Sequence, residues 1–312
     1  MDARFDDREL GPRGGVPLVV QHHFTETELH PNELEGNHMP SVLVTGASRG
    51  IGLAIARHLS GRGWDVYATA RSAADLQDLG RLPNVHPLEL DVTDRSAVAG
   101  LPDHLPARLD GVVNNAGIIV QGPVEGLALD DLSRQLEVNV TAQIAVVQAV
   151  LPRLRAAQGR VVFMSSVSGL ITLPGTGAYS ASKYALESLA DALRIELRPW
   201  RIPVSLIEPG PTRTDMWGGA LDDYDRMTSQ LSPAHRALYA SHLVGNRKLL
   251  GRMQRLAGDP GKVVKAVDRA LTSRHPRRRY RCDNVSRAQL ALVSITPTAV
   301  NDAVFAAATT SR

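Results

Sequence analysis

The stretch Thr45-Gly46-Ala47-Ser48-Arg49-Gly50-Ile51-Gly52 separates an apolar run at residues 41–45 from an amphipathic run that begins at Gly50 and reaches Leu59. Its three glycines let the backbone turn sharply, approach a diphosphate closely and start a helix whose first amides face that charge. Such a turn needs a strand before it and a helix after it, and the flanking patterns predict both. We therefore expect a phosphate-binding strand-turn-helix unit at the beginning of the folded chain.

Short β-branched runs alternate with amphipathic stretches at least six times after Ser41. Strands are expected at residues 41–45, 64–69, 85–90, 109–114, 160–165, 202–207 and, as a short seventh strand, 279–281. Helices are expected at residues 50–59, 73–79, 130–151, 178–197 and 262–271. This alternation predicts an α/β fold of the Rossmann type, in which a doubly wound parallel sheet forms a single domain.

Local signals add detail to two of these elements. Asp130 stands where an N-cap is expected for the long helix, and Pro152 stands close to its expected end. Pro87 predicts an irregularity in the third strand, because proline has no amide to donate to a ladder.

The chain divides by composition into three parts, and the second contains a segment of different character. Residues 1–38 are polar and are expected to be a flexible leader, and residues 39–285 carry the Rossmann-type domain. Residues 286–312 follow as a C-terminal extension that contains Pro297. Within the domain, residues 216–258 read as a helical lid because glycines and proline interrupt the pattern, at Gly218-Gly219, Ser232-Pro233 and Gly245.

Composition excludes several classes of protein. The 312 residues are 43% hydrophobic and 21% charged, which is typical of a globular protein. A net charge of +3 predicts no nucleic-acid partner, and the single Cys282 excludes an internal disulfide. No window approaches the ~18 consecutive apolar residues of a membrane span. The beginning of the chain has no signal-peptide core, and we expect a cytoplasmic protein without a bound metal.

Tyr179 and Lys183 are four residues apart in the expected helix over residues 178–197 and therefore project from nearly the same face. A free phenol titrates near pH 10, and a fixed cation beside it would favour the phenolate and lower that pKa. The pair is a candidate proton-transfer device. Taken alone, it also fits an ordinary surface helix with a half-exposed tyrosine and a solvated lysine.

The glycine spacing and three other motifs decide between these interpretations. Asn114-Asn115-Ala116-Gly117 follows the fourth strand, and Ser166 stands thirteen residues before Tyr179. Together with Gly-x-x-x-Gly-x-Gly and Tyr-x-x-x-Lys, these motifs resemble the short-chain dehydrogenase/reductase family over residues 41–215. The resemblance implies a catalytic set of Asn139, Ser166, Tyr179 and Lys183. It also implies cofactor contacts from Gly46, Ser48, Arg49, Gly50, Ile51, Gly52, Arg71, Asp91, Val92, Asn115, Ala116, Gly117, Tyr179, Lys183, Pro209, Gly210, Thr212 and Thr214.

The same residue types suit the chemistry of carbonyl reduction. A ketone that accepts hydride becomes an alkoxide, which the Ser166 hydroxyl would stabilise while Tyr179 donates its proton. Lys183 would lower the phenol pKa, bond the nicotinamide ribose and connect through water to the Asn139 carbonyl. In reverse, the set would oxidise an alcohol.

The second strand is followed by Ala70 and Arg71, where an Asp or Glu would bind the ribose 2'-hydroxyl of NAD. Arg49 in the glycine turn supplies a second guanidinium, and two guanidiniums suit a 2'-phosphate. We therefore expect NADP(H) to be preferred over NAD(H).

Loose patterns after Thr214 and around Arg279-Tyr280 resemble the branch that contains 17β-hydroxysteroid and retinol dehydrogenases, which implies a bulky apolar carbonyl or alcohol substrate. A homodimer or homotetramer through the helices at 130–151 and 178–197 is expected. Two alternatives stay open: a 3-oxoacyl thioester reductase and a non-catalytic NADP(H)-sensing module. Residues that would line a pocket, or equally form ordinary core, are Leu170, Ile171, Leu173, Met216, Trp217 and Leu221.

Overall fold

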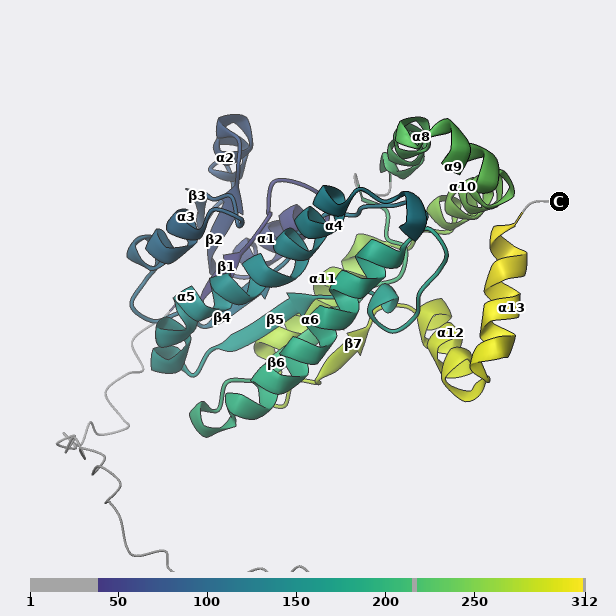
Figure 1. Cartoon of the computed structure of the whole chain (residues 1–312). Helices are drawn as coiled ribbons and strands as arrows, with labels where there is room; N and C mark the ends of the chain where they lie inside the picture. Colours follow the sequence, from purple (N-terminus) through teal and green to yellow (C-terminus); the bar gives the residue numbers. More distant parts are fainter. Residues whose placement is uncertain (1–38, 215–217, 311–312) are drawn as a thin grey trace, which may run out of the picture. The chain divides into compact units, whose positions relative to one another are not determined.

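A parallel sheet of seven strands forms the centre of the computed structural model, which describes residues 39–214 and 218–310 (Figure 1). The strand order is β3-β2-β1-β4-β5-β6-β7, which reverses direction between β1 and β4 as in a doubly wound sheet. The expected strands are all present. Their bounds are Ser41–Val44 (β1), Asp65–Ala70 (β2), Val85–Glu89 (β3), Gly111–Asn114 (β4), Arg160–Met164 (β5), Val204–Glu208 (β6) and Arg279–Arg281 (β7).

Helices cover both faces of this sheet. The helices up to the end of β6 are Gly50–Ser60 (α1), Ala73–Leu79 (α2), Arg95–Gly100 (α3), Leu129–Leu136 (α4), Ala142–Ala157 (α5) and Gly177–Glu196 (α6). The later helices are Ala220–Gln230 (α8), Pro233–Leu238 (α9), Ala240–Arg255 (α10), Pro260–Thr272 (α11), Asn284–Ile295 (α12) and Thr298–Thr309 (α13). The short α3 was not among the expected helices, because six residues hold too little periodicity to be recognised.

Alternate residues of each strand face the two layers of helices, and two hydrophobic cores result. On one face, Val42 and Val44 of β1 pack with α1 and α11. On the other face, Leu43 of β1 and Phe163 of β5 pack with α3, α5 and α6. Figure 1 shows α5 and α6 in front of the sheet and α11 behind it. The continuous apolar strands follow from this burial on both sides.

The expected helix over residues 130–151 is two helices joined by a π-helical turn at Glu137–Thr141. Its N-cap is Ala128, so Asp130 is not the cap but lies in the first turn, where a carboxylate still stabilises the helix dipole. The expected end at Pro152 was also wrong. Because Leu154 is fully buried, packing offsets the hydrogen bond that Pro152 removes, and α5 continues to Ala157.

The irregularity expected at Pro87 was also wrong. β3 pairs with β2 in continuous register, with Pro87 opposite Ala68. β3 is the edge of the sheet, and an edge strand has one side on which no strand needs the missing amide.

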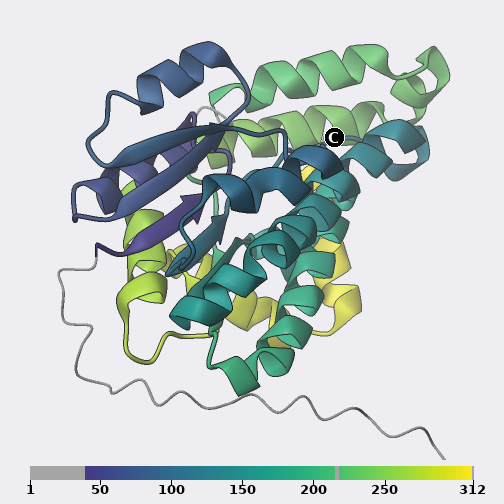
Figure 2. The same cartoon turned by 90° about the vertical axis from the view of Figure 1, so that its left-hand side faces the viewer.

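Residues 218–310 include two groups of helices outside the sheet's layers: α8, α9 and α10 form the first group, and α12 and α13 form the second. α8, α9 and α10 share their own small core of Ala220, Tyr224, Leu231, Leu243 and Leu250. Figure 1 shows this helical group beyond one end of the sheet, Figure 2 shows its helices in green along the upper side of the view, and α13 packs along α10. Gly245 does not interrupt α10 as expected. Instead, the absence of a side chain there lets the Thr309 carbonyl approach the helix closely.

Candidate active site

The glycine turn is built as the sequence predicts. Gly46 and Gly50 have φ values of +63° and +58°, a region in which side chains other than glycine are strained. Gly52 is required for space, because a Cβ there would collide with the Gly46 carbonyl and lie 2.5 Å from Nδ2 of Asn115. That Nδ2 donates to the carbonyls of Thr45 (3.0 Å) and Gly46 (2.9 Å). The end of β4 therefore holds the turn in place.

The same turn is fastened to β2 and presents unpaired amides. The Gly46 amide donates to Oγ1 of Thr69 at 3.1 Å, and the Ala47 amide donates to the Thr69 carbonyl at 2.8 Å. Arg49 is the N-cap of α1 and makes no side-chain hydrogen bond to the first amides of the helix. A helix start with such free donors and no acidic residue in its first turn fits a diphosphate. Ser48 and Ile51 flank this position, in the turn and in the first turn of α1.

Ser166, Tyr179 and Lys183 come together at the carboxyl end of β5. Ser166 follows β5 and caps the short 3₁₀ helix Val167–Gly169, where its Oγ accepts the Ser168 amide at 3.1 Å. Tyr179 and Lys183 lie on successive turns of α6, with Nζ 5.7 Å from the centre of the phenol ring. Nζ donates to the Met164 carbonyl at 2.7 Å. The serine is thus both the loop cap and a neighbour of the phenol.

Burial dominates the electrostatics of this group. Burial raises the pKa of the Tyr179 phenol, and its hydrogen bond with Ser166 acts in the opposite direction. The net shift of this pKa is upward, opposite to the lowering that we expected beside Lys183, because desolvation outweighs the hydrogen bond from Ser166. Burial lowers the pKa of Lys183 to about 8, against the attraction of the Glu187 carboxylate. At neutral pH the phenol keeps its proton and the ammonium keeps its charge.

Asn139 lies in the π-helical turn and is fully buried. Its Nδ2 donates to the Ile118 carbonyl at 3.0 Å and to Oγ of Ser182 at 3.2 Å, and its Oδ1 accepts the Ile118 amide at 2.9 Å. The Ser182 hydroxyl in turn donates to the Tyr179 carbonyl at 2.6 Å. The side chain of Asn139 therefore ties the wide turn to the first turns of α6.

The adenosine side of the site contains the two expected guanidiniums and one carboxylate. Arg49 and Arg71 are exposed, and Nη1 of Arg71 lies 3.9 Å from Oδ2 of Asp91. Hydrogen bonds from Thr93 hold the pKa of Asp91 below its usual value, with a smaller contribution from Arg71. Val92 beside it is buried. Ala116 and Gly117 follow Asn115, and the Gln143 amide donates to the Ala116 carbonyl at 2.7 Å.

The loop after β6 is fastened to the C-terminal helices. The Gly210 amide donates to Oδ2 of Asp283 at 3.3 Å, and Asp283 also caps α12. Thr212 forms a parallel bridge with Gly258, and its Oγ1 donates to the Gly210 carbonyl at 2.9 Å. Thr214 lies beside the glycine turn, 3.5 Å from the position of a Cβ on Gly50. Residues 209–214 thus connect the glycine turn with the region beyond β6.

The expected pocket residues are only partly described. Ile171 is buried, and Leu170, Leu173 and Leu221 are half-buried. Met216 and Trp217 lie outside the described residues.

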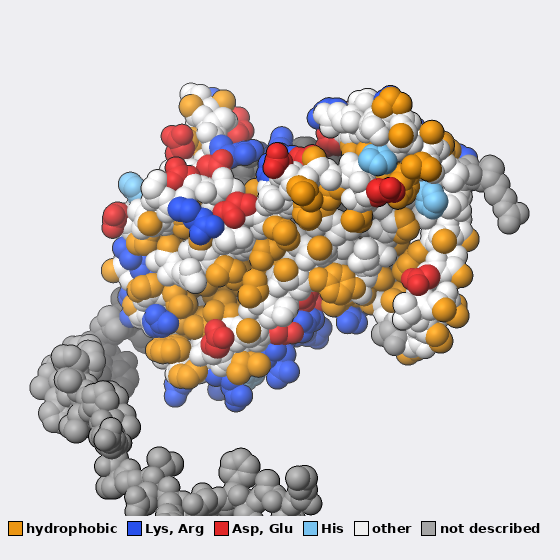
Figure 3. All heavy atoms as spheres, viewed as in Figure 1, with side chains coloured by type: hydrophobic (Ala, Val, Ile, Leu, Met, Phe, Trp, Pro, Cys, Tyr) orange, Lys and Arg blue, Asp and Glu red, His pale blue; other side chains and the backbone are white. Residues whose placement is uncertain are grey.

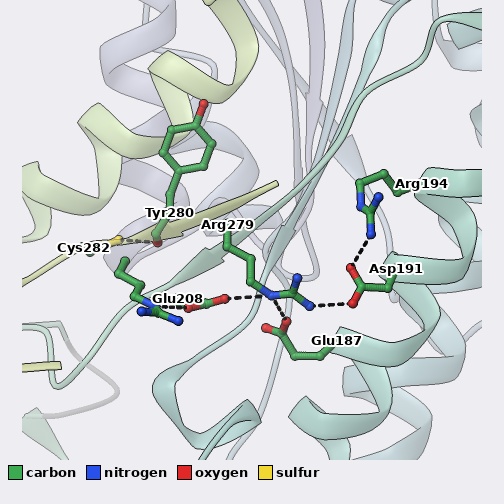
Figure 4. Close-up of polar contacts among 8 residues, drawn as sticks. Glu187, Asp191, Arg194, Glu208, Arg279, Tyr280 and Cys282 are labelled. Atoms are coloured by element: carbon green, nitrogen blue, oxygen red, sulfur yellow. Dashed lines mark hydrogen bonds and ion pairs between the residues drawn. The ribbon is translucent and has the colours of Figure 1, made fainter. Parts of the chain in front are cut away.

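Sequence reasoning missed a cluster of charges behind Lys183. Glu187 and Asp191 on α6, Glu208 at the end of β6 and Arg279 on β7 meet in one network (Figure 4). The signal that could have found it is the spacing of four that continues from Tyr179 through Lys183 to Glu187 and Asp191.

The fold and the glycine turn define a dinucleotide-binding protein of the Rossmann type. The family model described as short chain dehydrogenase matches residues 40–225. The chain belongs to the short-chain dehydrogenase/reductase family and is an oxidoreductase of that family. Among the described residues, no helix has both the length and the apolar character needed to cross a membrane.

Two curated relatives and one solved structure illustrate this membership. Retinol dehydrogenase 5 of Homo sapiens is 36% identical over 254 residues, which cover 77% of this chain and 79% of the relative. NADPH-dependent 3-dehydrocapnine reductase of Ornithobacterium rhinotracheale is 37% identical over 216 residues, covering 63% and 76%. The crystal structure of a short-chain dehydrogenase from Streptomyces avermitilis superimposes with a TM-score of 0.69 at 29% identity, covering 83% and 94%.

Proposed function

We propose that this protein is an NADP(H)-dependent reductase or dehydrogenase that interconverts a bulky apolar ketone or aldehyde and the corresponding alcohol. The observation that carries the proposal is the meeting of Ser166, Tyr179 and Lys183 at the carboxyl end of β5. This edge of a parallel sheet, next to the reversal of strand order, is where ligands of such folds bind.

Ser166, Tyr179 and Lys183 have different roles in proton transfer. The bound cofactor supplies or accepts the hydride. Tyr179 holds its proton at neutral pH, since burial raises the pKa of the phenol, and donates it to the substrate oxygen during reduction. The Ser166 hydroxyl, which shares a hydrogen bond with the phenol, stabilises the negative charge that develops on that oxygen. The Lys183 ammonium favours the phenolate that remains.

The Lys183 ammonium and the Asn139 carbonyl are proposed to return a proton to the phenolate through water. In support, the π-helical turn around Asn139 departs from the regular hydrogen-bond ladder, and such turns occur frequently at functional sites. The side-chain amide of Asn139 already makes hydrogen bonds to Ile118 and Ser182. Its backbone carbonyl is therefore the group that we propose to bind the water.

The preference for NADP(H) rests on Arg49 and Arg71. The first is the N-cap of α1 and the second follows β2, and both are exposed where a 2'-phosphate would stand. The relative from Ornithobacterium rhinotracheale, named as NADPH-dependent, supports this choice. The Asp91 carboxylate at 3.9 Å from Arg71 accepts hydrogen bonds from Thr93, so that guanidinium keeps donors for a phosphate.

An apolar substrate is supported by the retinol dehydrogenase relative and by the apolar residues that follow Ser166 in the chain, among which Ile171 is buried and Leu170 and Leu173 are half-buried. Residues 216–258 are proposed to close over it as a lid. Tyr239 at the start of α10 donates to Oε2 of Glu125 at 2.7 Å, which links this group of helices to the segment before α4.

The protein is proposed to be a homodimer or homotetramer through α4, α5 and α6. Tyr184, Leu189 and Ile195 are exposed large apolar side chains on α6. Figure 3 shows hydrophobic side chains gathered over the region of α5 and α6. Light scattering after size-exclusion chromatography tests this assembly. A mass near the 33.6 kDa of one chain at all concentrations would contradict it.

The activity is tested with a panel of ketones, aldehydes and alcohols that includes steroids, retinoids and 3-oxoacyl thioesters, each with NADPH and NADH. We expect turnover with bulky apolar carbonyls and NADPH. Preferred turnover of 3-oxoacyl thioesters would instead identify a thioester reductase. Tight NADPH binding without oxidation of the cofactor on any substrate would identify a sensing module and refute the proposed activity.

A further inference from the structure

A stripe of four polar residues runs along one side of α6, spaced four residues apart: Tyr179, Lys183, Glu187 and Asp191. Four residues advance a helix by about 6 Å and slightly more than one full turn, so consecutive members of the stripe are neighbours. The first two residues belong to the proposed active site. The third places a carboxylate directly behind the buried ammonium of Lys183.

The Glu187 carboxylate is enclosed on both sides. Its side chain is only 7% exposed, and its Oε2 accepts Nε of Arg279 at 3.0 Å. Gly169, in the short helix that Ser166 caps, lies against it, and a Cβ there would come within 3.0 Å of Cγ of Glu187. The carboxylate is therefore held between β7 and the loop that carries Ser166, with no freedom to turn into solvent.

Burial raises the pKa of Glu187, and the Ser165 hydroxyl and the Arg279 guanidinium act in the opposite direction by stabilising the ionised carboxylate. The same guanidinium also contacts Oδ2 of Asp191 at 2.7 Å and Oε1 of Glu208 at 3.2 Å (Figure 4). Glu208 is fully buried at the end of β6 and has a second cation, Arg281, at 3.4 Å from its Oε2. Two buried carboxyl groups that share one guanidinium would take up a proton if that guanidinium were lost.

We propose that Glu187, held by Arg279, is a positioning residue that keeps Lys183 protonated in the active site through the charge of its carboxylate. The inference rests on the proposed function only where it is tested by measuring enzyme activity. A negative charge about one helical turn away opposes the desolvation of the ammonium, and attraction at such a distance is substantial in a partly buried site. The same charge disfavours loss of a proton from either member of the Tyr179 and Lys183 pair.

Glu187 is the carboxylate whose charge raises the pKa of Lys183 against burial. β5 and the two residues after it contribute neutral groups, the Met164 carbonyl and the Ser165 and Ser166 hydroxyls, and the π-helical turn contributes the amide of Asn139. The titratable or charged groups that face Lys183 or stand behind Glu187 are Tyr179 and Asp191 on α6, Glu208 on β6, and Arg279 and Arg281 on β7.

The test compares two carboxylate-to-amide substitutions on α6, at two residues whose carboxylates both contact the guanidinium of Arg279. Glu187→Gln removes the charge next to Lys183. Asp191→Asn removes a charge that also contacts Arg279 but lies a further turn away and is 38% exposed. We expect the alkaline limb of the pH profile of kcat/KM to move to lower pH by at least about 0.5 unit in Glu187→Gln, and by less than about 0.2 unit in Asp191→Asn.

A purely structural role would lower the Tm or the activity of both variants without moving the limb, and this result would overturn the proposal. Equal movement in both variants would also overturn it.

A readout without catalysis separates this inference from the proposed function. The titration of Lys183 is followed by NMR in protein with isotope-labelled lysine, and the signal is assigned with Lys183→Met. A lower pKa of Lys183 in Glu187→Gln than in the wild type would support the inference even for a protein without reductase activity. The same pKa in both proteins would refute it, whatever the substrate panel shows.

Discussion

Nδ2 of Asn115 lies 2.9 Å from the carbonyl oxygen of Gly46, so that a side chain following β4 holds the glycine turn that follows β1. Because of this contact, there is no space for a side chain at Gly52. A Cβ on Gly52 would lie 2.5 Å from the same Nδ2 and would collide with the same carbonyl. The phosphate-binding turn therefore depends on two strands and on the glycine that lets α1 approach them.

Gly52→Ala is expected to displace this turn. Forcing extra volume into a packed region costs about 1–3 kcal/mol of stability. We also expect the Kd for NADPH, measured by fluorescence titration, to rise at least about tenfold, because the displaced amides no longer face the diphosphate. Gly100→Ala is the control, since nothing lies within 4 Å of the added Cβ. An unchanged Kd in Gly52→Ala would contradict the assigned role of the turn.

Tyr179→Phe removes the group that transfers the proton. We expect kcat to fall by about 10²-fold or more, with a Kd for NADPH within about twofold of the wild-type value. Tyr184→Phe is the matched control on the same helix, because Tyr184 is 44% exposed and lies outside the catalytic stripe. Steady-state rates and cofactor titration of both variants check the assignment. Activity retained in Tyr179→Phe would refute it.

Arg71→Ala is expected to weaken binding of NADPH selectively. A charge-assisted hydrogen bond to a phosphate contributes about 1.5–3 kcal/mol, which corresponds to a rise in KM for NADPH of about tenfold or more. The KM for NADH should stay within about twofold. Arg81→Ala removes another exposed arginine, which pairs with Asp78, and should change neither value. A preference for NADH in the wild type that Arg71→Ala leaves unchanged would exclude NADP(H) as the preferred cofactor.

Glu208→Gln is expected to change how stability depends on pH. Burial raises the pKa of Glu208 from 4.5 to about 6. The folded protein therefore binds this proton more tightly than the unfolded chain does. The resulting stabilisation, about 2 kcal/mol, is present below pH 4.5 and is lost as the pH rises through about 6.

The Tm of Glu208→Gln minus that of the wild type should thus increase by a few degrees between pH 4.5 and pH 6.5. Asp191→Asn provides the control. Its hydrogen bond to Arg279 lowers the pKa of Asp191, so the carboxylate stays ionised throughout this range and the corresponding difference should be flat. A flat difference for Glu208→Gln would show that its carboxyl is not protonated near pH 6.

Gly245→Ala tests the packing of the C-terminal helices. A Cβ at this position would collide with the Thr309 carbonyl at the end of α13. We expect earlier cleavage after α12 in limited proteolysis, and a loss of about 1–3 kcal/mol of stability. Gly251→Ala, on the same helix, meets its nearest neighbour, Leu221, at 4.0 Å and should be neutral. Identical proteolysis of the two variants would contradict the close approach of α13 to α10.

Sequence patterns predicted most of the fold because the repeating units are local. A β-branched run of five residues or an apolar repeat of 3.6 residues follows from neighbouring positions alone, and the seven strands were found in this way. The errors fell where tertiary contacts override local preference. Pro152 lies inside α5 because Leu154 is buried beyond it, and Gly245 lies inside α10 because Thr309 needs the space.

By itself, the sequence determined the glycine turn and the spacing of Tyr179 and Lys183, since one turn of backbone sets both arrangements. Only the tertiary structure decided what surrounds them. Arg279 meets Glu187 across 92 positions of sequence, and Asn115 reaches Gly46 across 69. Such contacts depend on the order and register of strands, which local patterns do not encode. For the same reason, only the structure showed that burial raises the pKa of Tyr179, and that an anion one turn further along α6 lies behind Lys183.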